Sequence, residues 1–304
     1  MRCMLYGGTY VAQIFKTTIL LAALTGLFLG VGYMVGGQSG ALIALFIAAA
    51  MNFGMYWFSG SLVLKTQGAK PLDETEHANI VKMVRELAQA DGLPMPKLYY
   101  VDTPLPNAFA TGRNPKNAVV AVTDGITQIL NDAELKAVIG HELGHVKNRD
   151  MLVSTIAATL AGAISWIANL AFFFGGDEDS PNPIALFAMI ILAPLAAMLV
   201  QMAVSRSREF LADQHGAGLV GGGRDLASAL QKLEDFKMSV PPIQPSPTQQ
   251  SQAHLMFANM FSARGLAGLF STHPSTQARV ARLQAFDKKN PSGPMTGGPI
   301  LERR

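Results

Sequence analysis

The chain of 304 residues contains a single cysteine, Cys3, and few charged residues. One cysteine cannot form an internal disulfide or a thiolate metal site, so any metal must be bound mainly by His, Asp or Glu. Charged residues make up only 15% of the chain, whereas hydrophobic residues make up 49%. A soluble enzyme would usually carry more charge, so this balance favours a protein that is partly embedded in lipid.

A strong basic patch is also missing, although the formal net charge is +3. The basic residues are scattered or lie beside apolar runs. A nucleic-acid-binding surface would need them clustered in a stripe, often interleaved with aromatic residues. We therefore expect no nucleic-acid partner.

Charged residues are absent from the long run between Lys16 and Lys65. The run is interrupted by the glycine-rich stretch 36–40, which divides it into two halves, roughly 17–35 and 41–64. Each half has the length of about 20 apolar residues that a helix needs to cross a bilayer. The run therefore predicts a membrane-spanning helical hairpin.

A second uncharged pair follows at 151–175 and 183–205, separated by the short acidic loop 176–182. This pair brings the predicted number of spans to four, and Pro194 is expected to kink the last one. Alternatively, the first apolar run could be a cleaved secretory signal and the others buried helices. The first run is long for a signal core, lacks an obvious Ala-x-Ala site and is followed at once by a second span. Four spans are the better interpretation.

The basic residues near the spans predict the orientation, because cytoplasmic loops carry an excess of Lys and Arg. In a four-span arrangement these residues all fall on one side of the membrane: Arg2, Lys16, Lys65, Lys70, Lys147, Arg149, Arg206 and Arg208. The loops on the opposite side are uncharged or acidic. Both termini and the large polar regions are therefore expected in the cytoplasm.

The polar regions have the patterns of a folded domain. The first contains a predicted helix from Asp73 to about Ala90, strands at 97–101 and 117–122, and a turn-rich stretch at 107–112 between them. A further helix is expected from Asn131 to His145, where Asn131 can cap its start. The second contains helical patterns from Arg206 to about Lys237 and from Ser275 to Phe286. The fold class is thus mainly α with a small β-sheet.

Five segments follow from these patterns. They are an N-terminal transmembrane hairpin (1–65), the first part of a cytoplasmic catalytic domain (66–150), a second transmembrane hairpin (151–205), the second part of that domain (206–289) and a disordered tail (290–304). Within the fourth segment, the Pro/Gln/Ser-rich stretch 240–252 has the composition of a loop or lid.

The sequence His-Glu-Leu-Gly-His at 141–145 falls on the predicted helix. Residues four apart share a helix face, so His141 and His145 can bind one metal ion with Glu142 beside the metal-bound water. This is the pattern of a zinc hydrolase, in which Glu142 accepts a proton from that water and returns it to the leaving amine. A polar helix face with two solvated histidines is the alternative. Gly144 inside the helix requires a packing reason, since glycine destabilises helices.

Two histidines leave a catalytic zinc site one protein ligand short. Glu209 is the candidate, because it follows the fourth apolar segment directly. Asp213 lies one turn further on the same face, where a carboxylate can orient a ligand imidazole. On spacing alone, Glu209 could instead form an ion pair with Arg206 or Arg208. The rival ligands are His215, His254 and His273.

The apolar hairpin, the motif at 141–145, two further spans and the segment Ser-Arg-Ser-Arg-Glu-Phe-Leu-Ala-Asp at 205–213 together resemble the bacterial HtpX heat-shock proteases. These proteases belong with the CAAX prenyl protease and a mitochondrial stress protease among the gluzincins. The likeness covers almost the whole chain. It includes 106–112 and 271–275, the latter followed by Arg279.

The resemblance implies one zinc ion per chain, bound by His141, His145 and Glu209, with Glu142 as general base. It implies a zincin-like domain on the cytoplasmic side of the bacterial inner membrane. The expected activity is ATP-independent cleavage of misfolded membrane proteins in a stress response. The expected partners are membrane protein substrates, the lipid bilayer and other membrane quality-control proteases.

The resemblance also assigns roles outside the metal site. It implies that an edge strand captures substrate in extended form by strand addition. Its residues are Asn107, Ala108, Phe109 and Ala110. Composition alone predicts a turn there. By the same resemblance His273, held by Arg279, helps to stabilise the oxyanion of the tetrahedral intermediate. Without it, His273 and Pro274 are more simply a helix start.

Three other functions fit the sequence less well. An intramembrane protease would bury the motif in the bilayer, but Lys136, Lys147, Arg149 and Asp150 surround it and would be too costly there. A scaffold with structural zinc would need a fourth protein ligand and no adjacent base. A transporter usually carries ionisable coupling groups, whereas the four predicted spans contain no Asp, Glu, Lys, Arg or His.

Overall fold

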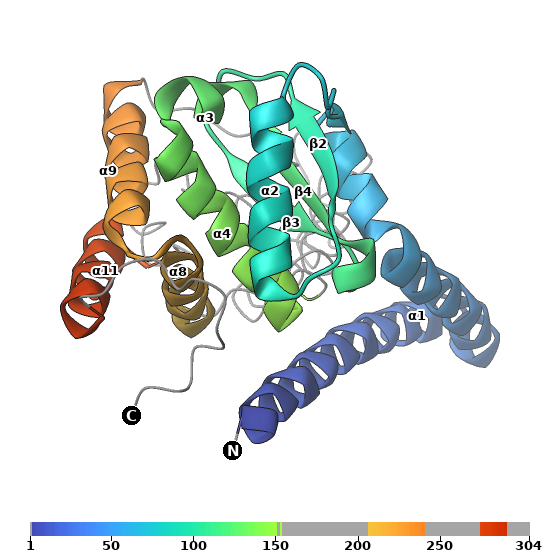
Figure 1. Ribbon diagram of the computed structural model, residues 1–304. Coiled ribbons are helices and arrows are strands. Elements are labelled where there is room, and N and C mark those ends of the chain that lie inside the picture. The colour runs from blue at the N-terminus through green and yellow to red at the C-terminus, as the bar shows by residue number, and fades with distance from the viewer. Residues whose placement is uncertain (1, 151–152, 154–205, 241–273, 291–304) are drawn as a thin grey trace.

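Figure 1 shows the protein in a computed structural model, which describes residues 2–150, 153, 206–240 and 274–290. The second apolar pair, including Pro194, lies outside the described residues apart from Val153. Nearly all of the Pro/Gln/Ser-rich stretch and of the C-terminal tail also lies outside them, as do His254 and His273. The four-span arrangement and the disordered tail therefore stay predictions.

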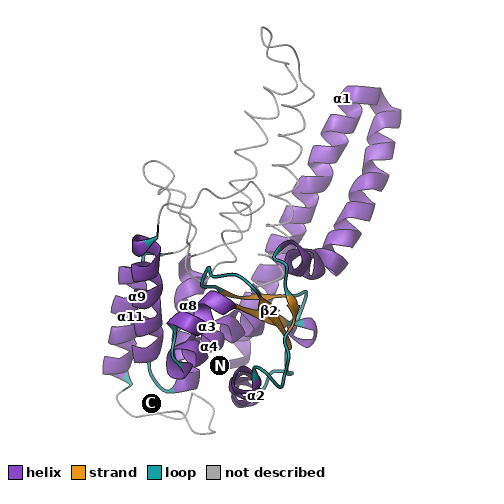
Figure 2. Ribbon diagram, turned by 90° about the horizontal axis from the view of Figure 1, so that it is seen from above, coloured by secondary structure: helices purple, strands orange, loops and turns teal. Residues whose placement is uncertain are grey.

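The N-terminal element α1 (Arg2–Thr66) is one continuous helical segment of 65 residues. Gly37 lies in the predicted turn and has a φ of 57°, a left-handed conformation that glycine adopts readily. Figure 2 shows α1 doubling back on itself so that its two arms lie side by side. Among the described residues, one segment of α1, Gly37–Phe58, is long and apolar enough to cross a membrane. Its large apolar side chains are mostly exposed, as on a lipid-facing surface: Leu42, Ile43, Phe46, Phe53, Trp57 and Phe58.

The sheet has four strands in the order β1 (Lys70–Pro71), β2 (Lys97–Val101), β4 (Val119–Thr123) and β3 (Ala108–Thr111). β4 pairs parallel to β2 and antiparallel to β3, with Phe109 opposite Ala121. The prediction of a turn at 107–112 from composition was wrong, because residues 108–111 form β3. Pairing with β4 outweighs the weak strand propensity of the two alanines in this strand. An edge strand is present, as the family resemblance implied, but it spans Ala108–Thr111 and leaves Asn107 directly before it.

Helices cover one face of the sheet. α2 (Ala78–Asp91) and α4 (Asp132–Asn148) pack there in the main apolar core. The short helix η1 (Pro115–Asn117) connects β3 to β4, and the short helix α3 (Asp124–Ile129) connects β4 to α4. The predicted start of α2 at Asp73 was too early. The Asp73 carboxylate instead accepts hydrogen bonds from the backbone N–H groups of Thr75 and Glu76 and holds a turn before the helix.

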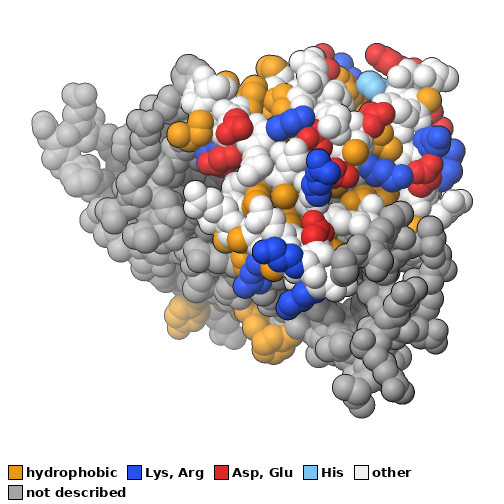
Figure 3. Space-filling model, turned by 60° about the vertical axis from the view of Figure 1, so that its left-hand side comes forward, with side chains coloured by type: hydrophobic (Ala, Val, Ile, Leu, Met, Phe, Trp, Pro, Cys, Tyr) orange, Lys and Arg blue, Asp and Glu red, His pale blue; other side chains and the backbone are white. Residues whose placement is uncertain are grey.

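The second part of the domain adds three helices: α8 (Arg206–Val220), α9 (Arg224–Ser239) and α11 (Thr276–Lys289). The glycine run 221–223 separates α8 from α9. α8 and α9 pack on α4, and α11 packs on both of them, so α4 lies between the sheet and the C-terminal helices (Figure 1). The surface on the α9 and α11 side has basic and acidic side chains interspersed (Figure 3), as expected for a face in water.

The other face of the sheet contacts the end of α1. Val63 and Leu64 form a small apolar cluster with Phe109 and with residues of β2 and β4. The alternation of side chains along β3 therefore directs Phe109 towards α1, and Ala108 and Ala110 towards the core around α4. The predicted mainly α fold with a small sheet is confirmed.

Candidate metal centre

The helix α4 carries the two histidines of the motif and begins at a complete capping box. Asn131 accepts a hydrogen bond from the N–H of Glu134, and Glu134 accepts one from the N–H of Asn131. These bonds satisfy backbone donors that a helix start leaves open. The helix ends at Asn148 and is capped by Arg149, whose φ of 59° is left-handed. The predicted helix around the motif is confirmed.

α8 crosses α4 at very close range because both helices carry glycine at the contact. A Cβ on Gly144 would lie 3.2 Å from the Cα of Ala212, and a Cβ on Gly216 would lie 2.6 Å from the backbone nitrogen of His141. Real Cβ atoms do not come that close to a backbone nitrogen, so Gly216 is the tighter of the two positions. The close crossing supplies the packing reason that Gly144 required.

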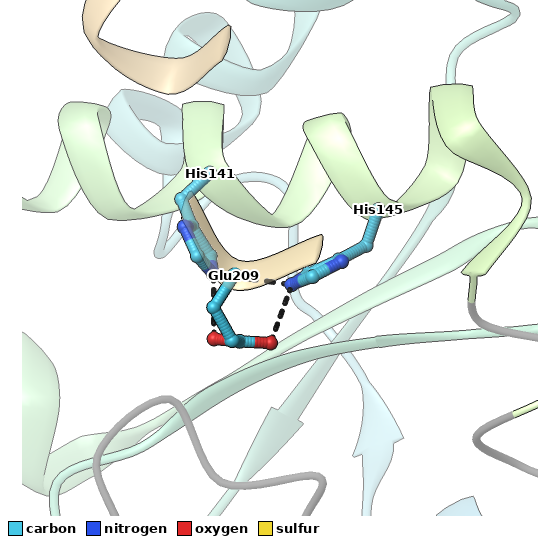
Figure 4. A group of neighbouring side chains, drawn as sticks. All are labelled: His141, His145 and Glu209. Carbon is cyan, nitrogen blue, oxygen red and sulfur yellow. Dashed lines mark hydrogen bonds and ion pairs between the residues drawn. The ribbon is translucent and has the colours of Figure 1, made fainter. Parts of the chain in front are cut away.

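The crossing brings Glu209 on α8 to the two histidines on α4 (Figure 4). The Nε2 atoms of His141 and His145 are 3.1 Å apart. The Glu209 carboxylate places Oε1 3.5 Å from His145 Nε2 and Oε2 3.8 Å from His141 Nε2. The three potential ligand atoms lie within 4.8 Å of one another. Two imidazoles and one carboxylate are the protein ligands of a known class of catalytic zinc site.

The outer nitrogen of His141 is held by a buried carboxylate. His141 Nδ1 lies 2.9 Å from Asp213 Oδ1. Arg279 on α11 donates two hydrogen bonds to Asp213, from Nη2 at 2.6 Å and from Nε at 2.9 Å. This arrangement leaves Nε2 of His141 as the nitrogen that faces Glu209. The structure thus places Asp213 where the sequence predicted an orienting carboxylate.

His145 has a matching support that sequence reasoning missed. Its Nδ1 lies 3.3 Å from Oδ2 of Asp150, and Oδ1 of Asp150 lies 3.6 Å from Nη1 of Arg208. In the sequence both residues look like charges at a membrane boundary. Their positions in the sequence could have indicated this role, since Asp150 lies two residues after the end of α4 and Arg208 directly precedes Glu209.

The carboxylate of Glu142 is buried beside the edge strand. Its Oε2 accepts a hydrogen bond of 2.9 Å from the N–H of Ala110. Burial raises the pKa of Glu142 to about 7, and the nearby Glu209 carboxylate acts in the same direction. A carboxyl group with a pKa near the working pH is suited to accepting and returning a proton.

The electrostatics of the centre favour a cation. Burial lowers the pKa of His145, but the carboxylates of Asp150, Glu209 and Glu142 outweigh burial and raise it to about 9. For His141 burial dominates and lowers the pKa to about 4. Positive charge is therefore stabilised where the His145 imidazole meets Glu209. The residues present fit a divalent metal ion both in donor type and in charge.

Other predicted residues have different surroundings. His215 Nε2 lies 2.8 Å from Asp91 Oδ2, in a cluster where Lys147 also contacts Asp91, and it does not join the three-residue group. Asn107 is buried, and its N–H donates to Thr123 Oγ1. His273, the expected partner of Arg279, lies outside the described residues.

Residues 74–287 match the model of Peptidase family M48. The chain is 51% identical over 277 residues to a "Protease HtpX homolog" of Methylibium petroleiphilum, covering 90% of this chain and 98% of the relative. It is 51% identical over 271 residues to a protein of the same description from Ralstonia nicotianae, covering 88% and 94%. A crystal structure of S. mikatae Ste24p aligns with a TM-score of 0.49 and 17% identity, covering 91% of this chain and 66% of that chain. The chain therefore belongs to peptidase family M48 and, within it, to the HtpX group of membrane metalloproteases.

Proposed function

We propose that the protein is a zinc-dependent endopeptidase of the bacterial inner membrane that hydrolyses peptide bonds in misfolded or damaged membrane proteins. The observation that carries the proposal is the buried group of His141, His145 and Glu209, with Glu142 next to it on the same helix. A structural metal site would not need an uncoordinated carboxylate beside its ligands.

Zinc is the metal that this donor set fits best, since mixed imidazole and carboxylate ligands are typical of catalytic zinc. His141, His145 and Glu209 would hold one ion per chain. When bound, such an ion polarises the scissile carbonyl and lowers the pKa of a bound water. The outer nitrogens of both imidazoles face carboxylates, which keeps Nε2 of each directed at the centre.

Glu142 is proposed as the group that moves the proton. Its Oε2 is held by the N–H of Ala110, which restricts how the carboxylate can turn. Glu142 accepts a proton from the attacking water and donates it to the leaving amine. Because the carboxylate is buried, it exchanges the proton with the reacting groups rather than with bulk water.

β3 is proposed to bind substrate. The carbonyl of Asn107 accepts a hydrogen bond from the N–H of Thr123, so by alternation the backbone groups of Asn107 and Phe109 face β4. Those of Ala108 and Ala110 face away from it, as the bond from Ala110 to Glu142 illustrates. An extended peptide added along this edge would pass beside Glu142.

The proposed membrane substrates are supported by the contact of β3 with α1. A Cβ on Gly60 of α1 would lie 3.4 Å from the Cα of Gly112, directly after β3. The guanidinium of Arg113 lies 3.9 Å from the ring centre of Trp57, near the end of the candidate span. Trp and Arg are frequent at the membrane boundary. A peptide on β3 would therefore lie close to the bilayer surface.

Metal removal tests the proposed activity. Full-length protein in detergent should cleave an unfolded membrane protein at internal peptide bonds, as mass spectrometry of the products would show. Treatment with a zinc chelator should abolish cleavage, and one equivalent of added zinc should restore it, because two imidazoles and one carboxylate bind this metal well. If metal analysis shows that the metal has been removed completely and cleavage still persists, the proposal is contradicted.

The orientation has a separate test. The excess of Lys and Arg on one side of the predicted spans places the C-terminus in the cytoplasm. A reporter enzyme that works only in the cytoplasm should therefore be active when fused after Arg304, while one that works only in the periplasm should be inactive. The opposite result would reverse the topology and leave the metal centre unaffected.

A further inference from the structure

Asp150 and Arg208 lie at the two ends of the segment 151–205, the predicted second transmembrane hairpin. Asp150 directly follows Arg149, the C-cap of α4, and Arg208 lies in the first turn of α8. Both are buried, with 3% and 7% exposure. The Asp150 carboxylate bridges two partners, with Oδ2 at 3.3 Å from His145 Nδ1 and Oδ1 at 3.6 Å from Arg208 Nη1.

We propose that Asp150 and Arg208 are positioning residues that hold the two halves of the metal centre in register. Their proposed role rests on the zinc centre described above. His145 belongs to the half that precedes the hairpin, and Glu209 belongs to the half that follows it. Asp150 directs Nε2 of His145 inward and, through Arg208, fixes the start of α8, where Glu209 is the next residue.

The energetics of a buried ion pair agree with a positioning role. Removing two charges from water costs as much as their attraction returns, so such a pair contributes little net stability to a fold. Loss of one partner is nevertheless costly, because it leaves the other charge buried and unpaired. In the sequence the two halves of the centre are separated by residues 151–205, so the contact between Asp150 and Arg208 links the half that carries His145 directly to the half that carries Glu209.

The centre contains a second pair of a carboxylate and an arginine. Asp213 contacts His141 Nδ1 and accepts two hydrogen bonds from Arg279. That pair joins α8 to α11, whereas Asp150 and Arg208 join the end of α4 to α8. Each imidazole is thus oriented by a carboxylate that an arginine holds in turn, and loss of either pair should loosen one ligand without removing it.

Zinc affinity of the full-length protein in detergent tests the role of Asp150 and Arg208. Measured by competition with a chelator in a Glu142→Gln background, which prevents self-cleavage, Asp150→Asn should weaken binding by about 10-fold to 100-fold. Arg208→Gln should weaken it by about 10-fold, and Arg208→Lys should restore most of the affinity. If Arg208 acted only through its charge, Arg208→Gln would remove a cation and strengthen zinc binding. Weaker zinc binding by this variant therefore identifies a positioning role.

Glu134→Gln is the matched control. Glu134 is also 3% exposed, lies on α4 and pairs with Lys232, but it does not contact the metal centre. The Glu134→Gln substitution should leave zinc affinity unchanged even if thermal unfolding shows a less stable fold. Unchanged or tighter zinc binding by Arg208→Gln, in a protein that still unfolds cooperatively, would overturn the inference. If the parent protein bound no zinc, or bound it equally well after His145→Ala, the proposed metal centre itself would fail.

Discussion

Replacing Glu142 by glutamine is expected to lower kcat for peptide cleavage by about 100-fold to 10,000-fold, the usual contribution of a general base. Glutamine keeps the size of the side chain, and its carbonyl oxygen can still accept the hydrogen bond from the N–H of Ala110. It cannot accept a proton from water. Since His141, His145 and Glu209 are untouched, zinc content measured by atomic absorption should remain one ion per chain.

Two further measurements make the Glu142→Gln result specific. Glu134→Gln, on the same helix but at its capped start, should retain normal kcat. The Glu142→Gln protein should also bind an extended peptide without cleaving it, and hydrogen exchange of the Ala108 amide should slow on binding, because this amide faces away from β4. Full proteolysis by the variant would refute the assignment of the base, and unchanged exchange would refute the substrate strand.

Local features of the centre could be predicted because they depend on neighbours in the sequence. The spacing of His141 and His145 sets both on one helix face whatever the rest of the chain does. The capping of the α4 N-terminus by Asn131 and Glu134 could be predicted from the sequence for the same reason. The helix predicted to end at about Ala90 ends at Asp91, and Gly92 follows it with a left-handed φ of 67°.

Contacts that cross the segment 151–205 could not be predicted from spacing. Glu209 could be selected over an ion-pair role only through the resemblance to HtpX proteases, since no local pattern links it to His145. The contact between Asp150 and Arg208 could not be predicted, because it exists only once α8 has packed on α4. The reason for Gly144 is likewise a backbone on another helix, the Cα of Ala212. Composition alone predicted a turn at β3, and only the resemblance implied a strand, because its pairing with β4, not its own residues, makes it a strand.

Replacing Glu209 by alanine is expected to weaken zinc binding by more than the roughly 100-fold that loss of an outer partner can cost. The variant loses a ligand atom and leaves Arg279, whose Nη1 lies 4.0 Å from Glu209 Oε2, with less negative charge nearby. Both changes make the centre less favourable for a cation. Chelator competition should show the loss directly, and cleavage should fall with zinc occupancy.

The same substitution decides between the two roles that the sequence allowed for Glu209. If it served only as an ion-pair partner of a neighbouring arginine, Glu209→Ala would lower the free energy of unfolding but keep zinc affinity and, at saturating zinc, full kcat. As a metal ligand, its loss should remain visible in kcat even when excess zinc fills the site, because the remaining imidazoles no longer fix the ion beside Glu142. Gln214→Ala, an exposed position on the same helix, should change neither quantity and so separates a ligand effect from a general effect of alanine in α8.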